Sequence, residues 1–96
     1  AASDVYKRQE QIISFLRNCA TMIRKNDYIG FEELIAESIT LMNQLTALKK
    51  GELKRIQGQS GSTKVSMVYL NMVQEAQNVV SFTANLLKVS RKFQKE

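Results

Sequence analysis

Residues 64–93 read KVSMVYLNMVQEAQNVVSFTANLLKVSRKF, and this stretch decides the fold. Apolar and small residues recur in it at spacings of four and three without a break, which is the repeat of an amphipathic α-helix. The stripe that we expect to face the interior contains Val65, Tyr69, Met72, Ala76, Val79, Thr83, Leu86, Ser90 and Phe93. It is flanked on one side by Val73, Val80 and Leu87 and on the other by Val68, Phe82 and Val89. A stripe this wide predicts a helix that contacts two neighbours.

Two further helical patterns precede this stretch. The first covers residues 10–25 and carries Ile12, Leu16, Cys19 and Ile23 on one face. The second covers residues 31–57 and carries Leu34, Ile35, Leu41, Met42, Leu45, Leu48, Leu53 and Ile56. Between them, Asp27 is a candidate N-cap of the second helix, and the Gly- and Ser-rich residues 58–62 predict a loop before the third.

The sequence therefore predicts an all-α fold, an antiparallel up-down-up three-helix bundle with helices at about residues 10–25, 31–57 and 63–93. Short connections make consecutive helices antiparallel neighbours, with crossing angles of about 20°. This arrangement brings the acidic start of the second helix, with Glu32 and Glu33, close to Lys88, Arg91 and Lys92 at the end of the third.

The first nine residues carry a signal of a different kind. Residues 4–9, DVYKRQ, are what the codons GAT GTG TAT AAG AGA CAG encode, and these codons reproduce a transposon mosaic end used in preparing sequencing libraries. We interpret residues 1–9 as a sequencing-adapter artefact, which should be left out of fold reasoning. Residues 10–96 are then one helical domain, which we expect to be an N-terminally truncated fragment from a bacterial metagenomic read.

The composition argues against an enzyme. The chain has no histidine, which removes the most common general base and metal ligand, and no glycine-rich phosphate-binding loop. Its single cysteine, Cys19, lies in an apolar stripe, so we interpret it as a buried and unreactive thiol. We expect no catalytic residues and no cofactor. No apolar run approaches the roughly 18 residues of a transmembrane helix.

Basic residues outnumber acidic ones by 14 to 9. One group around the second and third helices forms a candidate surface for a partner or an anion: Lys49, Lys50, Lys54, Arg55 and Lys64. The alternative is a surface that serves solubility only. No aromatic residues interleave with these charges, which argues against a nucleic-acid partner.

Two segments carry a family resemblance. The first segment is Glu52-Leu53-Lys54-Arg55-Ile56, and the second, after the loop, is TKVSMVYLNMVQE from Thr63 to Glu75. Both resemble the PhoU-like helical domain. The likeness is greatest to the version at the cytoplasmic C-terminus of bacterial sodium/phosphate cotransporters. That family carries an acidic metal-binding pattern along this helix. Here the matching positions are Gln77 and Ser81, and only Glu75 is acidic, so the resemblance extends to the bundle but not to a metal site.

The resemblance implies a regulatory, non-catalytic domain in the cytoplasm, attached to the membrane part of a sodium-dependent phosphate transporter. Its partners would be its own upstream transmembrane domain or another helical bundle, with an anionic membrane surface or a second copy of the chain as further candidates. The alternative is a free-standing PhoU-type phosphate-signalling regulator or another helical adaptor.

Overall fold

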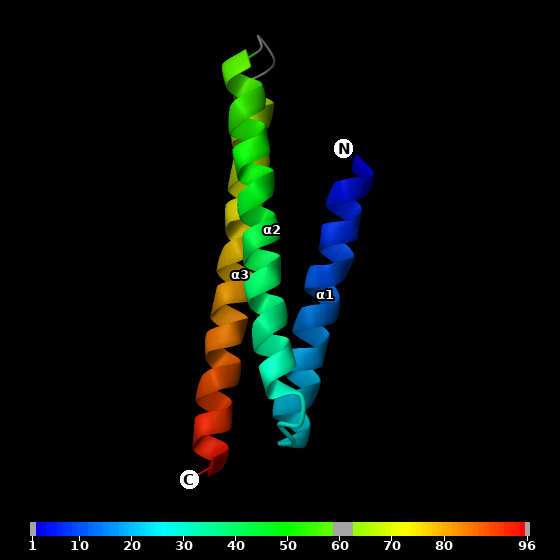
Figure 1. Ribbon diagram of the computed structural model, residues 1–96, viewed down its shortest axis with the longest axis vertical. Helices are drawn as coiled ribbons and strands as arrows, with labels where there is room; N and C mark the ends of the chain where they lie inside the picture. The colour runs from blue at the N-terminus through cyan, green and yellow to red at the C-terminus, as the bar shows by residue number, and fades with distance from the viewer. Residues whose placement is uncertain (1, 59–62, 96) are drawn as a thin grey trace.

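The computed structural model describes residues 2–58 and 63–95, which form three long helices (Figure 1). They are α1 (Ala2–Lys25), α2 (Phe31–Gly58) and α3 (Thr63–Lys95). The helices lie side by side in an elongated molecule of 55 × 22 × 17 Å, which confirms the predicted all-helical class. The first helix begins at Ala2 rather than near residue 10, so it includes most of the segment that we interpret as an artefact.

A tight turn reverses the chain between α1 and α2. Asn26 adopts a left-handed φ of 54°. The amide of Asn26 donates to the carbonyl of Ile23, and that of Asp27 to the carbonyl of Met22. This is the Schellman pattern that satisfies the last carbonyls of a helix. The Asp27 carboxylate accepts from the amide of Ile29, two residues on, so the prediction that Asp27 caps α2 is wrong.

The second connection was predicted as a loop over residues 58–62. Gly58 is the last residue of α2, and residues 59–62 lie outside the described part of the chain.

The end of α3 contacts the start of α2, as the sequence predicts. The guanidinium of Arg91 lies 4.3 Å from the ring centroid of Phe31, a cation–π contact. The same guanidinium lies 3.8 Å from the Glu32 carboxylate. The Glu32 side chain is largely exposed, so the ion pair contributes little compared with the packing of Arg91 on the ring.

All three helices contribute to a single core. Its buried apolar members are Phe15, Cys19, Phe31, Leu34, Leu41, Leu45, Val73, Val80, Ala84 and Leu87. Ile12, Leu16 and Ile23 from the first predicted stripe pack against it as expected. Phe15 and Phe31 are central members that the sequence prediction missed, and Leu53, which it placed inside, is about half exposed.

The predicted face of α3 is wrong in its central residues. Tyr69 and Ala76 pack against the core, but other members of the predicted stripe face solvent: Met72, Val79, Leu86 and Phe93. The buried positions of α3, here called the inner row, are Ser66, Val73, Gln77, Val80, Ala84 and Leu87. The helix is thus rotated by about one residue, roughly 100°, from the predicted orientation. The three-helix architecture remains, with a different face of α3 inside it.

Hydrogen bonds to α2 explain how the polar residues of the inner row can be buried. A count of apolar residues favours the stripe through Met72 and Val79, because the inner row is interrupted by Ser66 and Gln77. Both polar side chains find partners on α2. The Ser66 hydroxyl donates to the Glu52 carboxylate at 2.6 Å, and the Gln77 amide donates to the Thr46 hydroxyl at 2.9 Å. Because buried polar groups are tolerated once they are hydrogen-bonded, the inner row can be buried.

Two adjacent leucines test this orientation. Leu87 is fully buried, whereas Leu86 is 46% exposed. We expect Leu87→Ala to lower the free energy of unfolding by about 3 kcal/mol, through lost burial and a residual cavity. Leu86→Ala should cost less than about 1 kcal/mol, since exposed sites change stability little. Urea unfolding at low protein concentration measures both. Equal costs, or a larger cost at Leu86, would contradict the orientation.

Candidate functional site

The most distinctive surface of the molecule is an apolar face on α3. Its members, here called the outer row, are Val68, Met72, Val79, Phe82, Leu86, Val89 and Phe93. Each is between 44% and 71% exposed. They recur three or four residues apart, or seven where Glu75 interrupts them, so they form one continuous strip along most of the helix. Monomeric soluble proteins rarely expose a contiguous strip of this length without a function for it.

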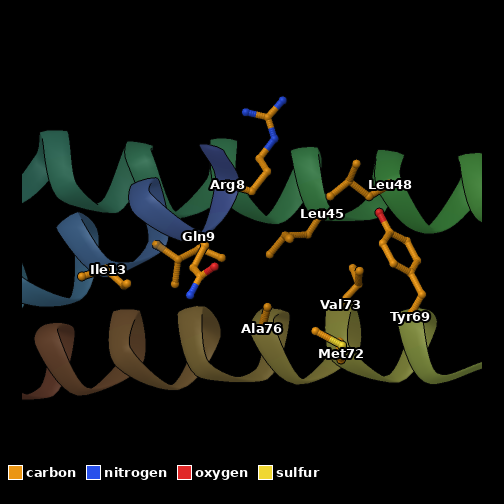
Figure 2. A pocket seen from close by; sticks show the side chains of 10 residues that line it. Arg8, Gln9, Ile13, Leu45, Leu48, Tyr69, Met72, Val73 and Ala76 are labelled. Carbon is orange, nitrogen blue, oxygen red and sulfur yellow. The ribbon is translucent and has the colours of Figure 1, made fainter. Parts of the chain in front are cut away.

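The N-terminal half of α1 stands away from the other two helices (Figure 1). A groove of about 290 Å³ lies there between the three helices, lined mainly by apolar side chains of α1, α2 and α3. Figure 2 shows Tyr69 reaching from α3 towards Leu48 of α2, with Met72 and Ala76 along the same wall. A second hollow joins Ile12 of α1 to Val68, Met72 and Val79 of the outer row. The apolar face therefore continues from α3 onto α1.

Uncharged residues border the outer row. On one side, successive turns of α3 present Asn71, Asn78 and Asn85, and on the other Ala76, Thr83 and Ser90. Between Lys64 and Lys92 neither border carries a charge. Positive charge on these borders is thus confined to the two ends of the outer row.

The predicted basic surface does not form one cluster on α2. Because successive helical residues are rotated by about 100°, only Lys50 and Lys54, which are one turn apart, share a side of the helix. Lys49 donates to the side-chain oxygen of Gln74 on α3 at 2.7 Å. Arg55 binds Glu52 at 2.8 Å, so two of the predicted cations already have partners within the chain. Lys64 lies exposed near the start of α3.

Glu52 is the one buried carboxylate of this region. Hydrogen bonds from Arg55 and then from Ser66 hold its pKa below the usual value, because both stabilise the ionised form. The contribution of this group to stability is therefore present above its unfolded pKa and is lost as the pH falls through the lower folded pKa. Glu52 links α2 to α3, a structural role that sequence reasoning missed.

Of the positions that match the metal ligands of the PhoU-like family, Gln77 and Ser81 lie one turn apart on α3, whereas Glu75 lies on the other side of the helix. Gln77 is only 5% exposed, and its amide donates to the Met42 carbonyl at 3.2 Å as well as to Thr46. Ser81 is exposed, and the Glu75 carboxylate, also exposed, accepts from Asn78. In residues 2–58 and 63–95, no three His, Cys, Asp or Glu side chains form a group that could hold a metal ion.

Cys19 is fully buried in the core. Burial, and secondarily the charge of Glu37, raise the pKa of its thiol to about 11. The reactive thiolate is thus scarce at neutral pH, and reagents have no access to the sulfur.

Comparison with protein-family models, with curated proteins and with solved structures finds no match to this chain. The relation to the PhoU-like domain therefore stays a prediction from the residues quoted above. Within the described residues, no helix combines the length and the hydropathy needed to cross a bilayer.

Placing a carboxylate at position 77, where the PhoU-like family carries an acidic residue, tests the role of Gln77. In Gln77→Glu, the new carboxylate would face the Met42 carbonyl, which cannot donate to it. We expect a loss of about 1–3 kcal/mol at neutral pH. Because the folded pKa of the new group would be raised, stability should recover as the pH falls below it. Urea unfolding at several pH values measures this. Stabilisation of the variant by Mg²⁺ or Mn²⁺ would instead indicate a latent metal site.

The thiol of Cys19 offers a second test. At pH 8 we expect a thiol reagent to modify the native protein only as fast as the chain opens, so that the rate rises with urea. Because the folded pKa is raised to about 11, stability should also fall as the pH rises from about 9 towards that value, as the unfolded thiol ionises first. Cys19→Ala should remove this alkaline dependence. Rapid modification of the folded chain would contradict the burial of the sulfur.

Proposed function

We propose that this chain is a non-catalytic binding domain that acts by docking another helix onto the outer row of α3. The observation that carries the proposal is the exposure of seven large apolar side chains along one helix face. Together they expose an area on the order of 700 Å², which exceeds the roughly 300–600 Å² of the largest apolar patch on a typical monomer. Covering this strip with a helix would remove apolar surface from water, and each Å² removed would favour binding by about 25 cal/mol.

In its more specific form, the proposal is that the chain is the cytoplasmic, regulatory PhoU-like domain of a sodium-dependent phosphate transporter. The residues of the α2–α3 hairpin quoted above, the three-helix arrangement and the excess of basic residues support it. The alternative is a free-standing phosphate-signalling regulator or adaptor. The gene upstream of Glu10 distinguishes them. Encoded transmembrane helices would support the transporter form, whereas a second bundle without membrane segments would support the alternative.

The docking itself can be tested in cells that express the native gene. In a Cys19→Ala background, Phe82→Cys places a thiol in the outer row, and Met67→Cys places one on an exposed position of α3 outside it. We expect the cysteine at position 82 to react at least tenfold more slowly in cells than in the dilute purified chain. The cysteine at position 67 should react at a similar rate in both.

Equal reaction of the two cysteines inside cells would show that nothing covers the outer row there, and the proposed function would be wrong.

A further inference from the structure

The outer row follows the repeat of a two-stranded coiled coil. From residue 68 the positions 68, 72, 75, 79, 82, 86, 89 and 93 alternate steps of four and three. All are apolar except Glu75. Two apolar positions in every seven form the narrow seam with which one helix meets one other helix. The core of the bundle uses different positions of α3, so this seam is additional to the internal packing.

We propose that the occupant of this seam is a second copy of the chain, packed α3 against α3 in a homodimer. This inference rests on the proposed function, because it identifies the partner that the outer row binds. The seam is about 25 residues long, so at about 1.5 Å per residue each copy presents a strip of roughly 38 Å to the other.

The borders of the seam favour a helix over a membrane surface. Helices that lie in a membrane interface carry Lys and Arg along the polar face and insert a broad apolar face. Here the positions beside the seam are neutral from Tyr69 to Ser90, with Lys64 and Lys92 only at its two ends, and Asn71 and Asn85 offer polar groups for hydrogen bonds with a neighbouring helix. The hollow between Ile12 and the outer row adds α1 contacts beside the seam.

Size and charge both fit self-association. The outer row exposes on the order of 700 Å² in each copy, close to the roughly 800 Å² per partner of standard interfaces. The net charge of +5 would oppose pairing if it lay along the seam, but beside the seam positive charge occurs only at the ends, at Lys64 and Lys92. Glu75 is the one unfavourable member, because pairing brings its carboxylate against apolar side chains. We therefore expect a dimer with a dissociation constant in the range of about 1–100 µM.

Sedimentation equilibrium of the purified chain over a wide concentration range tests the dimer. A matched pair of variants localises it: Met72 in the seam is 61% exposed, and Met67, on the same helix outside it, is 58% exposed. We expect Met72→Glu to weaken dimerisation at least tenfold and Met67→Glu to change it less than threefold. Glu75→Leu completes the apolar row, so it should tighten the dimer at least tenfold. Circular dichroism confirms that each variant keeps the helical fold.

Three results would overturn the inference: a chain that stays monomeric up to about 1 mM, equal effects of the two methionine variants, or no gain from Glu75→Leu. A monomer that binds vesicles containing phosphatidylserine, and loses this binding in Met72→Glu, would assign the same face to a membrane instead. If the chain is monomeric but position 82 is protected in cells, the homodimer fails while the proposed function stands. If the chain dimerises but position 82 is open in cells, the proposed function fails.

Discussion

The buried amide of Gln77 determines which side of α3 faces α2. It donates to the carbonyl of Met42 and to the hydroxyl of Thr46, and the hydroxyl of Thr46 itself donates to the same carbonyl. Eleven residues earlier, Ser66 binds Glu52 in the same way, from the same face of α3 to the same helix. A rotation of α3 by one residue would separate both pairs. Each buried polar group left without a partner would cost about 1–3 kcal/mol.

This orientation of α3 leaves the outer row exposed. Once Val73, Val80 and Leu87 point inward, the parallel series Met72, Val79 and Leu86 must point outward, since adjacent helical residues are about 100° apart. The domain thus has a satisfied core on one side of α3 and an uncovered apolar seam on the other. Its buried cysteine and its buried glutamate are both held in structural contacts. The outer row is the surface that we propose for function, because a seam of this shape is suited to another helix.

The sequence predicts the number and order of the helices and the approximate bounds of α2 and α3 well, because the absence of proline and the three-and-four spacing are local signals. It also predicts the approach of Arg91 to the start of α2 and the burial of Cys19. It fails where the outcome depends on pairing. Gln77 and Ser66 look polar and therefore exposed until their partners on α2 are known. For the same reason Glu52 was not recognised as a buried link, and the strip that looked like the core is the outer row.

The orientation of α3 is tested most directly by comparing the reactivity of cysteines at positions 79 and 80, introduced singly into a Cys19→Ala background. Val79 is 44% exposed and Val80 is fully buried, although both are valines on the same turn. In the dilute, folded chain we predict that the cysteine at position 79 reacts with a thiol reagent at least a hundredfold faster than the cysteine at position 80. Protection at position 79 together with rapid reaction at position 80 would show that α3 presents the opposite face to its neighbours.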